Sequence, residues 1–298
     1  MRITNSTLTT SFLKNLSKNL KNMETLQNQL SSGKLVSKPS DNPMLVSKIM
    51  NLNNNIMKNE QYNTNIEDSL GWVKTQDSAL SDVTAGLLRI RDLVVYGANG
   101  TLADTDRDAI NDEVKMEIKG LADVLNTNFD GRYIFGGQKT TSPPFTLVGD
   151  LLTYGGDSNN ITREISQGVT VDLLTDGDNI MTSTNASESD LGQLLNNIVI
   201  AMEDGNTDLL SEGLLGDIDQ HLDNVIRTRS QIGAVFNRLE AAESRNITEN
   251  LNLTELLSQR EDVDIAEKYM EYSVMKSVYQ ASLSAGASIL QPSLLDYL

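Results

Sequence analysis

Leu30-Ser-Ser-Gly-Lys34, followed by Lys38-Pro-Ser-Asp-Asn-Pro43, decides the fold of this 298-residue chain. Gly33 accepts the left-handed backbone conformation that ends a helix, so a helix that reaches this point stops here. Pro39 and Pro43 then bracket a turn. Three polar residues of that turn can cap the next helix: Ser40, Asp41 and Asn42. The stretch therefore predicts a stop and a restart between two helices, and we expect it to return the first helix against the last one.

The residues before this stop carry an apolar stripe at alternating spacings of three and four. Its members are Leu13, Leu16, Leu20, Met23 and Leu30, and Gln27 interrupts it between the last two. Such spacing is typical of a helix that packs along another helix. Lysines at positions 14, 18 and 21 lie off the stripe. The pattern predicts an N-terminal helical arm over residues 1–44, which pairs with the C-terminal arm.

The C-terminal arm, residues 261–298, is apolar over much of its circumference. We expect its assembly surface to consist of Val263, Met270, Val274, Val278, Tyr279, Leu283 and Leu290. A helix with so much apolar surface needs more than one neighbour. One N-terminal helix cannot cover it, so we expect other subunits to do so.

Charge is distributed unevenly along the chain, which has a formal net charge of −17. Residues 1–60 contain eight Lys or Arg against three Asp or Glu, whereas residues 261–298 contain two against six. Opposite signs at the two ends can orient two helices, although each exposed ion pair stabilises little. The acidic remainder argues against a nucleic-acid partner.

Long helices are permitted between the two arms because prolines occur only at 39, 43, 143, 144 and 292. Apolar spacing from Leu45 to Val94 predicts one helix of about 75 Å. Seven asparagines between 51 and 65 weaken helix propensity, so we expect the helix to persist there but to fray most easily. A turn at 97–104 and a further helix, with apolar residues from Ile110 to Leu125, follow. The two halves of this helical rod are expected at 45–138 and 189–260.

The helical spacing of apolar residues gives way to a different pattern over residues 139–188. There Gly and Pro separate short β-prone runs at 151–154, 161–165 and 169–174. The predicted fold is therefore mainly α with a small β-rich insertion. Its helical part is a long antiparallel bundle or coiled coil formed by both chain ends. We expect the insertion to be dispensable for joining subunits.

No residue pattern in the chain predicts catalysis, a cofactor or a metal. There is no cysteine, and the one histidine, His221, is expected at a surface or flanking position. Asp104, Asp106 and Asp108 alternate as calcium ligands do, but Ala109 and Lys115 stand where an EF-hand loop needs Gly and Glu. An acidic helix N-terminus is the better interpretation. The segment 176–179 is interpreted as a turn instead of a cation site.

Residues 1–11 lack the apolar core of a secretory signal, and no run of eighteen apolar residues occurs. The pattern predicts a soluble chain which, if it leaves the cell, does so without a cleaved signal peptide and without membrane insertion.

Three motifs resemble the terminal regions of bacterial flagellins. They are residues 30–34 with 40–43, Ile232-Gly-Ala-Val-Phe-Asn-Arg-Leu-Glu240 and Tyr279-Gln-Ala-Ser-Leu283. Three details favour the family members at the junction of hook and filament over filament flagellin itself. They are the Met1-Arg-Ile-Thr4 start, the Gly131-Arg-Tyr-Ile-Phe-Gly-Gly137 segment and the Ser293-Leu-Leu-Asp-Tyr-Leu298 ending.

The resemblance implies a structural subunit of the flagellum, exported through the flagellar type III apparatus and assembled outside the cell. The implied partners are further copies in a ring, the hook-side junction protein, filament flagellin and a flagellar export chaperone. Two alternatives stay open at this point. One is a minor filament flagellin; the other is a soluble coiled-coil adaptor or an enzyme on a helical scaffold.

Overall fold

The computed structural model describes residues 5–182 and 190–289. The chain forms two compact units. The terminal unit contains the residues up to 58 and those from 249 onward, and the core unit contains residues 59–248. Two long helices, α2 (Pro43–Gly97) and α7 (Leu215–Glu261), contribute residues to both units.

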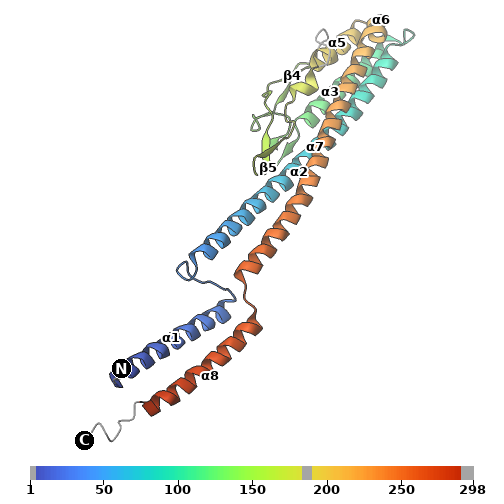
Figure 1. The fold of residues 1–298 in the computed structure, drawn as a ribbon. Helices are drawn as coiled ribbons and strands as arrows, with labels where there is room; N and C mark the ends of the chain where they lie inside the picture. The colour runs from blue at the N-terminus through green and yellow to red at the C-terminus, as the bar shows by residue number, and fades with distance from the viewer. Residues whose placement is uncertain (1–4, 183–189, 290–298) are drawn as a thin grey trace, which may run out of the picture. The chain divides into compact units, whose positions relative to one another are not determined.

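In the terminal unit, α1 (Asn5–Ser32) and α8 (Ile265–Ile289) lie side by side (Figure 1). Near the end of α1, the Gly33 carbonyl accepts a hydrogen bond from the Val263 amide at 3.0 Å. Near the start of α1, the ring of Phe12 lies against Gly286 of α8. The two helices are therefore antiparallel, which confirms the predicted pairing of the chain ends.

The stop and restart between α1 and α2 follow local backbone chemistry. Gly33 has φ +70°, the left-handed conformation predicted for it, directly after α1 ends. Asn42 caps α2, because its Oδ1 accepts a hydrogen bond from the Leu45 amide at 3.1 Å. Pro43 is the first residue of α2, where its missing N–H leaves no helical bond unmade.

The core unit is built on an antiparallel arrangement of α2 and α7. Two ion pairs mark the register: Arg91 to Asp219 at 2.7 Å and Arg229 to Asp77 at 3.1 Å. Apolar side chains of both helices are buried together with those of α3 (Asp104–Leu125) and α5 (Leu191–Glu203). Helix α2 is unbroken through the Asn-rich stretch, as predicted.

Among the described residues, the core unit also contains three two-stranded antiparallel hairpins and three short helical elements. The hairpins are β1 (Asn128–Phe129) with β2 (Arg132–Tyr133), β3 (Phe145–Val148) with β4 (Leu151–Tyr154), and β5 (Thr162–Ser166) with β6 (Val169–Asp172). The short helical elements are α4 (Asp178–Met181), α6 (Thr207–Leu209) and the π-helix η1 (Leu210–Leu214). The three predicted β-prone runs correspond to β4, β5 and β6, whereas β1, β2 and β3 were not predicted.

The hairpins are attached to the helices by side chains that reach their backbone. Asn65 of α2 donates to the Glu164 carbonyl of β5 at 2.9 Å, and Arg238 of α7 donates to the Thr170 carbonyl of β6 at 3.2 Å. Trp72 of α2 is buried and makes an edge contact with Phe129, with ring centroids 6.0 Å apart. The mainly α fold with a small β-rich insertion is thus confirmed. Among the described residues, no helix has the length and apolarity needed to cross a bilayer.

Candidate assembly surface on the terminal helices

Helix α1 meets α8 through one face, on which half-buried residues recur every three or four positions. The apolar members of this face are Phe12, Leu16, Met23, Leu26 and Leu30. On α8 the matching half-buried side chains include Tyr272, Met275 and Tyr279. Gly286 is buried at the far end of the pair, and a Cβ there would lie 2.2 Å from Cζ of Phe12. Only glycine allows the ring to approach the helix so closely.

A second apolar surface on α8 faces away from this contact. Met270, Val274 and Val278 follow one another at intervals of four, so they lie on one side of the helix. Their exposed fractions are 62%, 64% and 45%. Ile265, Tyr269 and Leu283 are also exposed. We call the row of Met270, Val274 and Val278 the outward row. Large apolar side chains this accessible on one helix mark a candidate interaction surface.

The twelve residues predicted as one assembly surface divide into two groups. Half-buried in the terminal unit are Leu16, Met23, Leu30, Val263 and Tyr279. Exposed are Leu13, Leu20, Met270, Val274, Val278 and Leu283. Leu290 lies outside the described residues. Phe12 and Gly286 were missed, although a glycine within an otherwise apolar helix is a signal of close packing.

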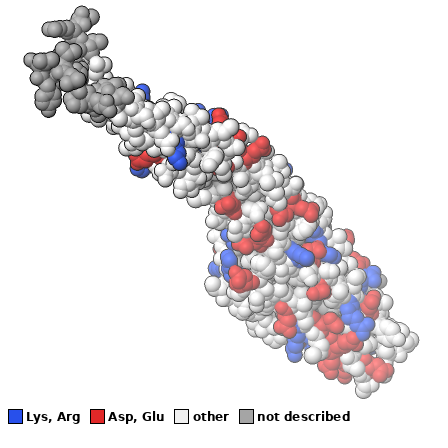
Figure 2. All heavy atoms as spheres, turned by 90° about the horizontal axis from the view of Figure 1, so that it is seen from below, with Lys and Arg blue, Asp and Glu red and all other residues white. Residues whose placement is uncertain are grey.

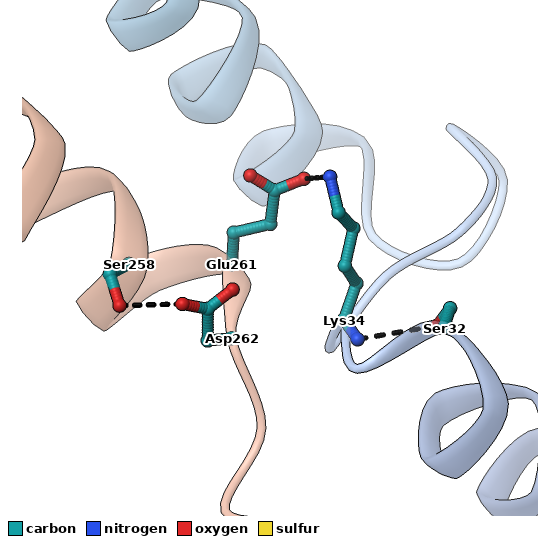
Figure 3. A network of polar contacts seen from close by, with 5 residues as sticks. All are labelled: Ser32, Lys34, Ser258, Glu261 and Asp262. Atoms are coloured by element: carbon teal, nitrogen blue, oxygen red, sulfur yellow. Dashed lines mark hydrogen bonds and ion pairs between the residues drawn. The ribbon is translucent and has the colours of Figure 1, made fainter.

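The segment that follows α1 is joined to the segment between α7 and α8 by backbone hydrogen bonds and by the side chains of Lys34 and Glu261, and Figure 3 shows this side-chain pair. The Leu35 amide donates to the Glu261 carbonyl at 2.7 Å, next to the bond between Val263 and Gly33. The Lys34 ammonium pairs with the Glu261 carboxylate, whose side chain is 13% exposed. These contacts hold the end of α1 against the start of α8.

Helix α8 has its own N-terminal cap. Asp264 Oδ1 accepts hydrogen bonds from the amides of Ala266 and Glu267, at 2.9 and 3.1 Å. Glu267 lies in the first turn, where a negative charge is favourable at the positive end of the helix dipole. These hydrogen bonds define where α8 begins.

His221 is buried, with 1% of its surface exposed, so the expected surface or flanking position was wrong. It lies on the inward face of α7, three residues after the buried Ile218 and four before the buried Val225. Asp190, at the start of α5, has its pKa raised by burial, while the nearby His221 acts to lower it. The helical spacing, and not the polarity of the ring, decided where the histidine lies.

The acidic segments singled out in the sequence serve as helix starts. Asp104 and Asp106 occupy the first turn of α3, as predicted. Asp176 accepts hydrogen bonds from the Asp178 amide and from Asn179 Nδ2, both at 2.9 Å, just before α4. The interpretation of 176–179 as a turn between strands was therefore wrong, because α4 begins at Asp178. Among the described residues, no three His, Asp or Glu side chains converge as metal ligands would. In Figure 2, acidic, basic and uncharged side chains are interspersed, and the face drawn has no continuous basic field.

Helices from the two ends of the chain pair with each other, and the β-rich insertion lies in the middle of the sequence. This arrangement defines a class of long-helix proteins whose terminal helices pack together. The family model for the bacterial flagellin N-terminal helical region matches residues 3–140, and that for the C-terminal helical region matches residues 215–298. The chain belongs to the bacterial flagellin family, a family of structural flagellar proteins.

The relatives of this chain include proteins named flagellar hook-associated protein 3 and proteins named flagellin. Flagellar hook-associated protein 3 of Escherichia coli is 29% identical over 294 residues, covering 89% of this chain and 91% of that protein. Flagellin of Bacillus subtilis is 27% identical over 292 residues, covering 95% of this chain and 94% of that protein. The solved flagellar junction protein FlgL of Legionella pneumophila has TM-score 0.58 and 16% identity, covering 72% of this chain and 100% of that one. This last similarity establishes a shared fold.

Proposed function

We propose that this chain is a structural subunit of the bacterial flagellum that joins the hook to the filament through its terminal helices. The outward row of α8 supports this most directly, because it remains exposed on a helix that has already packed against α1. The name of the E. coli relative associates that protein with the hook, and the L. pneumophila protein of the same fold is a junction protein.

Burial of the outward row supplies a driving force for assembly. Moving one Val, Leu or Met side chain from water into a packed interface contributes about 1.5 to 3 kcal/mol. Met270, Val274 and Val278 repeat this gain along one side of α8. Neighbouring copies in a ring would cover the row, and the exposed Leu13 and Leu20 of α1 would add to the same interface.

The proposal extends to partners and location. The subunit contacts further copies of itself, the hook-side junction protein and filament flagellin, and it acts in the extracellular part of the flagellum. A flagellar export chaperone would cover the apolar faces of the terminal helices before assembly, because exposed apolar rows associate non-specifically in a concentrated cell interior.

A pair of single substitutions on α8 tests the interface. Val274→Asp places a charge in the outward row, whereas Gln280→Asp places the same charge at an exposed position off that row. In cells that make only the variant subunit, we expect Val274→Asp to abolish filament attachment and to release flagellin into the medium. Cells with Gln280→Asp should swim and carry filaments normally. Equal assembly of both variants would contradict the proposed interface.

Immunolabelling of isolated flagella distinguishes the junction from the alternatives. A single band at the hook end supports the junction protein. Labelling along the whole filament supports a minor filament flagellin, the second candidate, which the similarity to B. subtilis flagellin favours. Flagella without label would contradict both the junction protein and the minor flagellin, and the soluble adaptor would then be the remaining interpretation.

A further inference from the structure

The turn between α2 and α3 contains Asn99-Gly100, the one Asn-Gly pair in the sequence. Both residues are exposed. The Asn99 carbonyl accepts a hydrogen bond from the Leu102 amide at 3.1 Å, which closes a four-residue turn. The Asn99 side chain turns back onto the same segment. Its Oδ1 accepts from the Thr101 amide at 3.2 Å and from Thr101 Oγ1 at 2.9 Å.

The neighbouring amide of Gly100 is unshielded. Within the residues that the structure describes, its N–H donates to no acceptor. Around the position that a Gly100 Cβ would occupy, no atom of another part of the chain lies within 4 Å. Glycine also leaves the backbone free to rotate, so its nitrogen can approach the side chain of the preceding residue.

We propose that Asn99 is a site of spontaneous deamidation in the folded protein. The Gly100 nitrogen attacks Cγ of Asn99, and the new N–Cγ bond closes a five-membered succinimide ring. The Cγ–Nδ2 bond breaks, and Nδ2 leaves as ammonia with the proton that Gly100 gives up. Water then opens the ring at either carbonyl, which yields aspartate or isoaspartate. No oxidant or reductant takes part.

The two hydrogen bonds to Oδ1 favour the attack. Negative charge develops on this oxygen as the tetrahedral intermediate forms, and donors already aimed at it stabilise that charge. Thr101 supplies both donors, one from its backbone and one from its hydroxyl. The turn therefore combines an unshielded nucleophile with an activated carbonyl.

Asn126 illustrates the opposite situation. Its Nδ2 donates to the Phe145 carbonyl at 2.8 Å, and its Oδ1 accepts from the Phe145 amide at 3.0 Å. Both ends of that amide are fixed by β3, and the next residue is Thr127, whose side chain hinders ring closure. We therefore expect deamidation at Asn99 and none at Asn126 over the same period.

Trypsin gives an unambiguous readout, because cleavage after Arg91 and Arg107 releases residues 92–107, in which Asn99 is the one amide side chain. The full-length protein is aged in mildly alkaline buffer and digested, and the peptide is examined for the mass gain that replaces NH₂ by OH. A synthetic peptide of the same sequence is aged beside it. Deamidation of the folded protein within a few-fold of the peptide rate supports the proposal. An unchanged folded protein when the free peptide has reacted overturns it.

Two surface variants separate the contributions of the turn. Gly100→Val should reduce the rate by more than tenfold, because a branched side chain crowds the nucleophile. Thr101→Val keeps the backbone donor and removes the hydroxyl, so it should slow the reaction several-fold in the folded protein and leave the free peptide unaffected. Equal rates for Thr101→Val and the parent in the folded protein would refute activation by the hydroxyl.

Discussion

Asn59 of α2 and Asn246 of α7 hydrogen-bond to each other inside the core unit. Asn59 Nδ2 donates to the Asn246 carbonyl at 2.9 Å, and Asn246 Nδ2 donates to the Asn59 carbonyl at 3.0 Å and to its Oδ1 at 2.6 Å. The two residues are 5% and 6% exposed. A shift of one helix along the other would leave both amides buried and unpaired, so the pair fixes the register of α2 against α7.

Removing one partner of this pair should destabilise the core unit. We expect Asn59→Ala to lower the free energy of unfolding by about 1 to 3 kcal/mol, because the Asn246 amide loses its partner while still buried. Replacing both residues by leucine should recover much of that loss, since no polar group is then left unpaired. Urea unfolding followed by the fluorescence of Trp72, the single tryptophan, measures the effect.

Gln61, an exposed amide two residues further along α2, provides the matched control. Gln61→Ala should change the free energy of unfolding by no more than about 0.5 kcal/mol. If Asn59→Ala behaves like Gln61→Ala, the buried pair does not contribute to register.

Gly286 should resist the substitution that normally stabilises a helix. Replacing an interior glycine by alanine usually gains about 1 kcal/mol. At Gly286 the added Cβ would meet the Phe12 ring, so we expect Gly286→Ala to loosen α1 from α8. Hydrogen exchange of the α1 amides should become faster in this variant.

Gly233 of α7 is the control for that prediction. It is also a helical glycine, but a Cβ there would meet no atom within 4 Å. Gly233→Ala should therefore stabilise by about 1 kcal/mol, as propensity alone dictates. Protection of the α1 amides in Gly286→Ala equal to that of the parent would show that the helices can separate enough to admit the methyl group.

The stability of the turn at Gly33 should depend mainly on the backbone conformation of this residue and little on the neighbouring ion pair of Lys34 with Glu261. No atom crowds a Cβ at Gly33, so Gly33→Ala costs only the left-handed strain, about 1 to 2 kcal/mol. Gly33→Asn should cost less, because Asn tolerates this conformation. Lys34→Ala removes a partly exposed ion pair and should cost at most about 1 kcal/mol. Hydrogen exchange of the Leu35 and Val263 amides measures each change. These amides should exchange faster in Gly33→Ala than in Gly33→Asn, and the reverse order would contradict the prediction.

Local rules explain which parts of this fold could be predicted from the sequence. The left-handed Gly33, the Asn42 cap and the acidic first turn of α3 depend on a few adjacent residues. Recurring apolar spacing, which lapses at Asn59 and Asn63, and the absence of proline after Pro43 were enough for α2. These features were found because no distant contact overrides them.

Other features depend on contacts that the sequence does not state. Leu13 and Leu16 belong to one stripe, yet only Leu16 is half-buried, because the stripe is wider than the contact that α8 makes. The hairpin of β1 and β2 is too short for period-two alternation to reveal it. His221 was expected at a surface or flanking position, whereas its place between the buried Ile218 and Val225 on α7 decided its burial.

The carboxyl of Asp176 should make the folded protein more stable at acid pH than at neutral pH. A salt-bridged acid has the opposite effect. Burial, and then repulsion by Asp178 and Asp157, raise its pKa in the folded protein above the ordinary value. Its ionised form is thus favoured by unfolding, so this group stabilises the folded state most at acid pH, and that stabilisation is lost as pH rises through the raised pKa. Asp176→Asn does not titrate. The stability of the parent relative to this variant should therefore improve from neutral to mildly acid pH in urea unfolding monitored by Trp72.

Asp178→Asn tests the cause of this shift. It removes one repelling charge and leaves Asp176 buried with the backbone hydrogen bond from residue 178. Because burial is the larger cause, the pH dependence should weaken without disappearing. Complete loss of the pH dependence in Asp178→Asn would show that charge repulsion, and not burial, is the dominant cause. If the stabilities of the parent and of Asp176→Asn respond identically to pH, Asp176 does not cause the pH dependence.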